Sequence, residues 1–269
     1  MMTYKFSDDK RMLAYGFQQS YSGIFCFSTT RHGGYSTGEY ASFNCNHYCG
    51  DEPERVNRNR ELLCSLMPVR PDGLVIPHQT HGTQIRQIDH AFLQLPLSEQ
   101  TIQLEGVDAL LTNIPRQCIC VSTADCIPVL CFDVRRRVVA AIHAGWRGTV
   151  ERIVEKTLSA MSEAYGTDAR DVVACIGPGI SQEAFEVGDE VYAAFRAAGF
   201  PMQYIARRYA KWHIDLWEAN RLQLLTAGVR QENIELSAIC TYANNTDFFS
   251  ARRQGIHSGR ILSGIMLTE

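Results

Sequence analysis

The sequence predicts a mixed α/β or α+β fold, formed as a single compact domain over residues 1–269. Short apolar runs rich in β-branched residues predict strands, and amphipathic stretches with helical spacing predict helices between some of them. Several strands follow one another through short turns, so we expect mixed sheets rather than a regular βαβ alternation. A hydrophobic content of 45% and a charged content of 20% are typical of a globular chain that can bury a large core.

Seven runs are expected to form strands. They span residues 23–30, 73–77, 84–89, 108–112, 118–122, 128–133 and 138–143. The clearest helix is expected over residues 149–164, where apolar residues recur at helical spacing. Further helices are expected over residues 54–67, 188–198 and 215–227. The chain contains neither GxGxxG nor GxxxxGK[ST], so the sequence gives no support to a dinucleotide fold or a P-loop.

Composition and charge exclude several classes of function. The formal net charge is −3 and the basic residues are scattered, so no basic stripe for nucleic acid is expected. No apolar run approaches the roughly 20 residues that cross a bilayer, so we expect no membrane partner. The segment MMTYKFSDDK shows no export signal. We therefore expect a cytoplasmic protein whose ten cysteines are reduced.

Three separate segments each carry a side chain that can bind zinc. They are PHQTHGTQ with His81, STADCIPVLCFD with Cys126, and AAIHAGWRGT with His143. Two imidazoles and one thiolate leave a fourth position for water or substrate, as in catalytic zinc sites. The alternative is that Cys126 and His143 are core residues at the ends of neighbouring strands. His78 competes with His81, but the adjacent Gly82 favours His81, and we interpret His78 as supporting or structural.

Candidates for binding an anion lie near these segments. The sequence AGWRGT leads into an expected helix, so free backbone N–H groups gather beside His143, and Arg147 adds a fork of donors. A helix start with Arg147 in a surface ion pair is the alternative. The loop STTRHGGYSTGEYASFNCN carries Arg31 and Asn44, although its glycines are also compatible with a simple turn. We predict Arg31, Asn44, Cys126 and Arg147 as catalytic residues.

These segments resemble the laccase-domain family, whose members have been named multicopper polyphenol oxidoreductase, peptidoglycan-editing factor and purine nucleoside phosphorylase. The similarity covers nearly the whole chain, and TADC together with HAGWRG is its most specific signature. The other matching segments are TTRHGGYS, the SFN of ASFNCN, QTHG, DALLTN, TADCIPVL, HAGWRGT, CIGPGISQEAFEVG, DLWEANRLQL, CTY and FFSARR. The resemblance implies a four-layer α/β/β/α sandwich and one zinc ion per chain, held by His81, Cys126 and His143.

The resemblance also implies an activity. Nucleoside-active members imply phosphorolysis of adenosine, inosine, guanosine and methylthioadenosine, with deamination of adenosine in the same pocket. Purine nucleosides and phosphate are then the expected partners, and the protein is expected to be a monomer or a homodimer. In this interpretation Arg31 and Arg147 orient phosphate toward the ribose C1′.

Three other functions are weighed against this one. A multicopper oxidase needs on the order of ten His ligands, whereas this chain has eight His and no His-x-His pair, so copper is less favoured than zinc. A cysteine hydrolase or amidase that edits peptidoglycan precursors would use Cys126 as nucleophile, with His143 or His81 as base. A structural zinc in a non-catalytic scaffold ranks last, because structural sites usually have four protein ligands.

Overall fold

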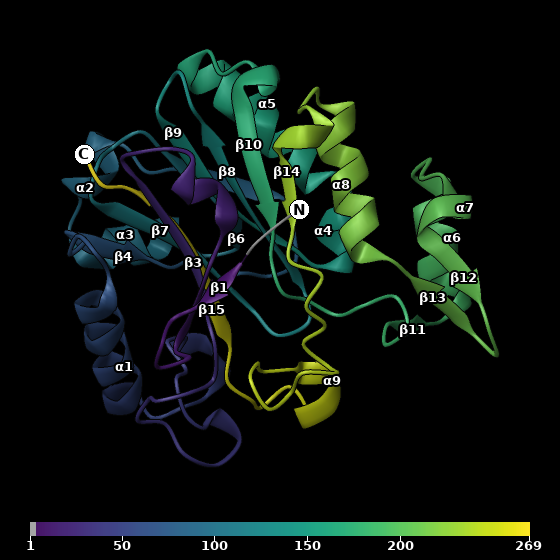
Figure 1. Cartoon of the computed structure of the whole chain (residues 1–269), viewed down its shortest axis with the longest axis horizontal. Helices are drawn as coiled ribbons and strands as arrows, with labels where there is room; N and C mark the ends of the chain where they lie inside the picture. The colour runs from purple at the N-terminus through teal and green to yellow at the C-terminus, as the bar shows by residue number, and fades with distance from the viewer. Residues whose placement is uncertain (1–3) are drawn as a thin grey trace.

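The computed structural model describes residues 4–269 and shows two six-stranded sheets packed face to face, with helices on their outer sides (Figure 1). A large apolar core lies between the sheets and includes Leu13, Ile119 and Ile265 from one sheet and Leu130 and Val139 from the other. The outer sides are covered by helices that bury their own apolar faces. The arrangement is the four-layer α/β/β/α sandwich that the resemblance implied.

The first sheet has the strand order β1-β2-β3-β15-β7-β4. Its neighbours are antiparallel except for β4 and β7, which run parallel. The bounds are β1 Lys5–Phe6, β2 Met12–Ala14, β3 Ile24–Thr29, β4 Gly73–Val75, β7 Gln117–Thr123 and β15 Ile261–Leu267. The C-terminal strand β15 therefore lies in the middle of a sheet built mostly from the N-terminal half of the chain.

The second sheet has the strand order β14-β10-β8-β9-β6-β5. Its inner strands are antiparallel, whereas β14 and β5 at the two edges each pair in parallel with their neighbour. The bounds are β5 Gln84–Gln87, β6 Val107–Thr112, β8 Ile127–Asp133, β9 Val138–Ala144, β10 Val172–Ile176 and β14 Ile234–Leu236. Both sheets are mixed, as predicted, and each of the seven predicted runs coincides with one strand.

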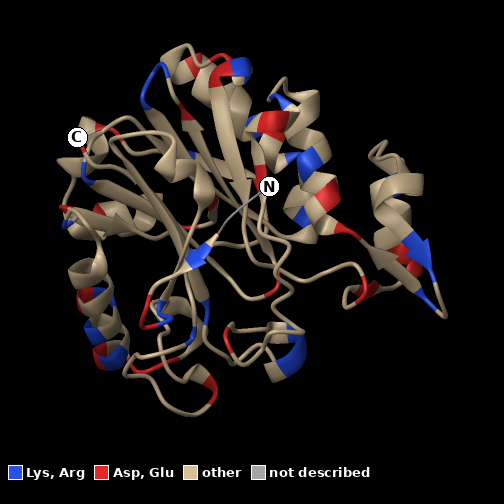
Figure 2. Ribbon diagram, in the orientation of Figure 1, with Lys and Arg blue, Asp and Glu red and all other residues tan. Residues whose placement is uncertain are grey.

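Helices cover the outer sides of the two sheets. Helix α1, Pro53–Leu66, begins with proline at its first turn and packs Leu63 against the first sheet. Helices α5, Ile153–Tyr165, and α8, Leu216–Thr226, pack on the second sheet. Figure 2 shows basic and acidic residues interleaved along α1 and α8, so these helices present no stripe of one charge.

A small third sheet, β11-β13-β12, lies to one side of the sandwich (Figure 1). Its strands are β11 Glu186–Val187, β12 Ala206–Arg208 and β13 Trp212–Ile214, and α6 Asp189–Ala197 and α7 Met202–Ile205 accompany it. Tyr192 of α6 stacks on Trp212 at 3.8 Å between ring centroids. The short elements of this region offered too few periodic residues to predict a sheet.

One predicted helix is wrong in its extent. The segment predicted as a single helix over residues 149–164 is divided between α4, Trp146–Val150, and α5. Arg152, with φ of 66°, takes a left-handed conformation that interrupts the helical path. The helix start that follows His143 is therefore a separate single turn, capped at Gly145.

Shorter helices complete the described chain. The α-helices are α2 His90–Leu93, α3 Leu97–Gln103 and α9 Ala251–Gln254. The 3-10 turns are η1 Gly16–Gln19, η2 Gly38–Tyr40, η3 His47–Cys49, η4 Ala169–Asp171 and η5 Gln231–Asn233. Within residues 4–269, no helix has the length and apolarity needed to span a membrane.

Candidate metal centre

The two sheets bring the three predicted ligands together at one end of the sandwich. His81 lies in the loop between β4 and β5, Cys126 in the turn between β7 and β8, and His143 near the end of β9. Their donor atoms all lie within 4.8 Å of one another, and the two imidazole rings are 4.9 Å apart between centroids. This convergence fits a shared metal ion with two nitrogen ligands and one sulfur ligand.

The backbone around the ligands is unusual for residues that carry side chains. His81 and Asp125 have φ angles of 65° and 87°, in the region that favours glycine. Such conformations cluster at functional sites, where the surrounding structure holds them in place. At Gly145 a Cβ atom would lie 3.0 Å from Cδ2 of His81 and 3.1 Å from Sγ of Cys126. A side chain at this position would therefore press on both ligands and displace them by a few tenths of an ångström.

Asp108 holds two of the three candidate ligands in position through hydrogen bonds. Its fully buried carboxylate accepts a hydrogen bond from Nδ1 of His143 at 2.7 Å, which leaves Nε2 of that ring free to bind a metal. The same carboxylate accepts backbone N–H bonds from Thr80, His81 and Gly82 at 3.3, 3.0 and 2.7 Å. One side chain thus orients His143 and also fixes the turn that carries His81. From the sequence, Asp108 was expected only to begin a strand.

Cys126 and His143 shift each other's pKa values. Burial opposes ionisation of the Cys126 thiol, but the charge and hydrogen bonds of His143 and His81 outweigh it and lower the pKa of Cys126 to about 6. Burial likewise disfavours the charged imidazole of His143, yet Cys126 and Asp108 together raise its pKa to about 9. The buried pair therefore favours a thiolate, which is the form of cysteine that binds metals.

A pocket of about 230 Å³ opens beside the three ligands. Tyr48 and His78 line it and stack on each other at 4.4 Å with an interplanar angle of 17°. His78 also bonds through Nδ1 to the carboxylate of Glu105 at 2.8 Å. His78, interpreted from the sequence as supporting or structural, thus forms part of the pocket wall, and Tyr48 provides an aromatic surface that the sequence analysis did not identify.

The other predicted catalytic residues, Arg31, Asn44 and Arg147, are not among those that line this pocket. Arg31 donates to the backbone carbonyls of Ala41 and Asn245, both at 2.9 Å. Arg147 is exposed and lies over the ring of Trp146 at 4.3 Å. Neither Arg31 nor Arg147 is among the residues that line the pocket. Their predicted catalytic roles stay predictions.

Asn44 supports the pocket from within the core. It is fully buried, and its amide nitrogen donates to Asp51 at 2.9 Å and to the carbonyl of Asn46 at 3.2 Å. Its amide oxygen accepts the backbone N–H of Arg260 at 3.1 Å. Asn46 and Arg260 both line the pocket. In this structure Asn44 therefore fixes two parts of the wall, and a direct catalytic role for it stays a prediction.

Asp125, whose orientation the sequence left open, binds the C-terminal part of the chain. Its carboxylate accepts hydrogen bonds from the hydroxyls of Thr241 and Ser250, both at 2.7 Å, and from the backbone N–H of Arg252 at 2.6 Å. These bonds hold the segment before α9 against the turn that carries Cys126. Asp125 is therefore a structural anchor beside the metal ligands.

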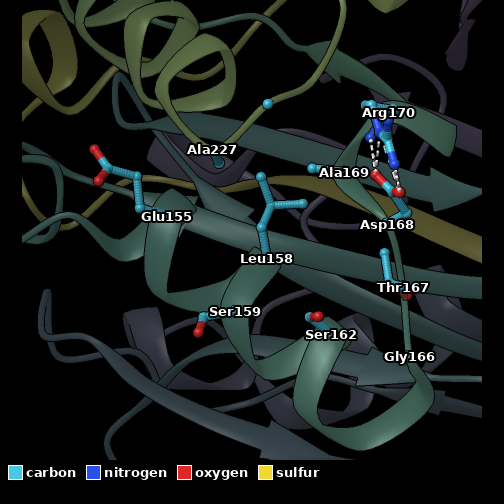
Figure 3. Close-up of a pocket in the computed structure, with 11 residues that line it drawn as sticks. Glu155, Leu158, Ser159, Ser162, Gly166, Thr167, Asp168, Ala169, Arg170 and Ala227 are labelled. Atoms are coloured by element: carbon cyan, nitrogen blue, oxygen red, sulfur yellow. Dashed lines mark hydrogen bonds and ion pairs between the residues drawn. The ribbon is translucent and has the colours of Figure 1, made fainter.

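A larger cavity, of about 740 Å³, lies at the far end of α5 (Figure 3). Glu155, Ser159 and Ser162 line it from the helix, and Asp168 and Arg170 form an ion pair on its other side. None of the three metal-ligand candidates lines this cavity.

Fold and site together define a four-layer α/β/β/α protein with a three-residue site suited to a metal ion. The chain belongs to the family described as multi-copper polyphenol oxidoreductase laccase, which it matches over residues 25–268.

Relatives of this family carry names that point to nucleosides. A protein from Bacteroides thetaiotaomicron named purine nucleoside phosphorylase is 55% identical over 262 residues, which are 96% of this chain and 97% of the relative. Adenosine deaminase RL5, from an unknown prokaryotic organism, is 44% identical over 93% of this chain and 96% of its own. The crystal structure of YlmD from Geobacillus stearothermophilus has a TM-score of 0.90 and 30% identity, with both chains covered completely.

Proposed function

We propose that this chain is a zinc-dependent purine nucleoside phosphorylase that also deaminates adenosine and cleaves methylthioadenosine by phosphorolysis. The observation that carries the proposal is the placement of His81, Cys126 and His143 beside a pocket walled by the stacked Tyr48 and His78. Relatives named purine nucleoside phosphorylase and adenosine deaminase support it. An aromatic wall suits the flat face of a purine, because stacked π-systems attract one another.

The site chemistry is compatible with both reactions. A zinc ion held by the three ligands would supply a Lewis acid that activates water near neutral pH. In deamination, water adds at C6 of adenosine and ammonia leaves, giving inosine. In phosphorolysis, a phosphate oxygen bonds to C1′ of the ribose while the bond from C1′ to N9 breaks, and the base departs with that electron pair. Both reactions need a bound purine, and the Tyr48–His78 wall would hold it.

We favour zinc over copper, and the cytoplasm over an oxidising compartment. A multicopper oxidase needs a trinuclear cluster as well as a mononuclear site, whereas residues 4–269 contain one group of three or more suitable ligands. That group is a His2Cys set with room for a fourth ligand, which suits zinc. All ten cysteines are free, which is compatible with a reducing environment. Whether the protein is a monomer or a homodimer stays a prediction.

The products formed from adenosine test the proposal. Zinc-loaded protein is incubated with adenosine in the presence and absence of phosphate, and the products are separated by chromatography. Phosphorolysis is expected to release adenine only when phosphate is present. Deamination is expected to give inosine without phosphate, and inosine together with the hypoxanthine formed from it when phosphate is present. With methylthioadenosine, adenine release should again depend on phosphate. If none of these products forms, the proposed activity is wrong.

The cysteine hydrolase is retained as a second candidate because the Cys126 thiol has a lowered pKa and lies beside two imidazoles. Peptidoglycan precursors would then be the substrates, with His143 or His81 as base. The two candidates make opposite predictions about the thiol. A catalytic nucleophile must be accessible in the active protein, whereas a metal ligand is protected by the ion.

Alkylation of Cys126 is expected to depend on metal and on pH. Because its pKa is about 6, the thiolate fraction in metal-free protein should rise as pH passes upward through that value, and the iodoacetamide rate should level off above about pH 7. Cys45 is the internal control, since burial raises the pKa of its thiol well above the usual range and should keep it unreactive. Peptide mass spectrometry identifies the modified residue. Rapid modification of Cys126 in zinc-replete, active protein would favour the hydrolase.

A further inference from the structure

Two residues that line the pocket carry buried hydroxyl groups with no hydrogen-bond partner among the described residues. These hydroxyls belong to Ser122 and Thr123, whose exposed fractions are 6% and 1%. Both residues line the pocket beside the metal-ligand candidates. Buried polar groups in folded proteins are nearly always paired, so an unpaired one at a pocket points to a partner that arrives from outside. The pocket is therefore built to receive a polar ligand as well as an aromatic one.

Arg260 directly precedes β15, which pairs with the strand that carries Ser122. Strands β15 and β7 are antiparallel, and Leu262 is directly opposite Ser122. Directly paired residues share a face, and so do residues two apart on one strand. Leu262 and Cys120 both belong to the core cluster on the side of α1. Arg260 lies immediately before the pair formed by Ile261 and Thr123, and both Arg260 and Ser122 line the pocket.

The guanidinium of Arg260 is held in place before any ligand binds. It donates from one terminal nitrogen to the carbonyl of Gly259 at 3.1 Å and from the other to the carbonyl of Ile256 at 2.8 Å. The buried Asn44 fixes the backbone N–H of the same residue. A cation immobilised in this way loses little conformational entropy when it binds an anion.

The charge of the pocket also favours an anion. No Asp or Glu is among the residues that line it, and Arg260 is the arginine that does. Arg31 and Arg147, the arginines predicted from sequence to orient phosphate, do not line it. Arginine and hydroxyl donors are a common combination for binding phosphate oxygens.

We propose that the Ser122 hydroxyl and the Arg260 guanidinium form the phosphate subsite of this pocket. The inference rests on the proposed function, in which inorganic phosphate is the second substrate. It assigns to Arg260 the role that sequence reasoning gave to Arg31 and Arg147. It also explains why the Ser122 hydroxyl is left unpaired in the protein alone, since phosphate would be its acceptor.

Ser122→Ala and Arg260→Lys test the subsite, with Ser237→Ala as the matched control. Ser237 also carries a buried hydroxyl without a partner in the described part of the chain, but it does not line the pocket. Calorimetry measures binding of inorganic phosphate to zinc-loaded protein without nucleoside, and steady-state kinetics measures KM for phosphate with inosine. Ser122→Ala and Arg260→Lys should each weaken phosphate binding roughly 10- to 100-fold, the cost of a lost hydrogen bond to a charged group.

The stability of the variants separates a ligand contact from a structural one. Ser122→Ala removes a hydroxyl that bonds nothing in the free protein, so its melting temperature should not fall, and its zinc content should match the wild type. Ser237→Ala should bind phosphate like the wild type. Calorimetry does not depend on turnover, so a protein without phosphorylase activity would contradict the proposed function while phosphate binding still tests the subsite.

Three outcomes would overturn the subsite. The first is equal phosphate affinity in the wild type, Ser122→Ala and Arg260→Lys. The second is no phosphate binding by the wild type in calorimetry. The third comes from a parallel titration with AMP. If AMP binds more tightly than phosphate and Ser122→Ala weakens both equally, the subsite belongs to a phosphate carried by the substrate rather than to the free second substrate.

Discussion

Cys126→Ala is expected to abolish both metal binding and nucleoside turnover. The substitution leaves two imidazoles and removes the anionic donor of a three-residue site. Removing a residue that merely orients a ligand typically costs roughly 10–100-fold in metal affinity or activity, so loss of a ligand itself should cost more. Zinc per chain is measured by elemental analysis after purification without added metal, and turnover is measured with adenosine.

Cys64→Ala is the matched control for this experiment. Cys64 is a partly buried cysteine on α1 that does not line the pocket, so zinc content and turnover should stay at wild-type values. His81→Ala and His143→Ala should behave like Cys126→Ala, because each removes one donor of the same group. An undiminished deamination rate in a metal-free Cys126→Ala protein would refute the zinc mechanism.

The sequence was a reliable guide to the centre of the sandwich. The predicted strands contain continuous runs of apolar β-branched residues, as buried strands do, and all residues of β6, β7, β8 and β9 are buried. The metal-ligand candidates could be found because a single His or Cys side chain can bind a metal whatever its neighbours in the sequence. Their convergence could not be derived from periodicity, since it depends on how three loops from two sheets meet.

The parts that sequence reasoning missed depend on long-range contacts. Strand β15 pairs with β3 and β7, which precede it by more than 130 residues, and no local pattern reports that pairing. Arg260 enters the pocket through this pairing, and Tyr48 enters it from a short 3-10 turn. Arg31 and Arg147 do not line the pocket, and their predicted catalytic roles stay predictions.

The role of Asp108 also could not be predicted from the sequence, because it arises from contacts made in the fold and not from a metal-binding pattern. Asp108→Asn is expected to weaken zinc binding by roughly 10–100-fold, as removal of a residue that orients a metal ligand does. The amide keeps the shape of the carboxylate but offers one acceptor oxygen where the carboxylate offers two. If that oxygen faces Nδ1 of His143, the NH2 group opposes the N–H groups of Thr80 and Gly82; in the other orientation it opposes Nδ1 of His143. Zinc affinity is measured by competition with a chelator, and turnover with adenosine.

The same substitution should change how stability depends on pH in metal-free protein. Burial raises the pKa of Asp108, but hydrogen bonds from His143 and from backbone N–H groups outweigh it, and the net pKa is lowered. A carboxyl whose folded pKa is depressed stabilises the fold above its unfolded pKa of about 3.9, and that contribution is lost as pH falls through the folded pKa. The wild type should therefore lose more stability on acidification below about pH 4 than Asp108→Asn does.

Asp133→Asn provides the comparison for a buried carboxylate away from the ligands. Asp133 is fully buried at the opposite end of β8 from Cys126, where it accepts backbone N–H bonds from Arg135 and Arg136. Its replacement should lower the melting temperature, because a buried donor left unpaired costs about 1–3 kcal/mol, but zinc affinity should stay unchanged. If Asp108→Asn and Asp133→Asn lowered stability alike and neither affected zinc, Asp108 would be a folding residue only. A loss of zinc affinity confined to Asp108→Asn instead requires that its carboxylate acts on the ligands that it contacts, through Nδ1 of His143 or through the backbone N–H of His81.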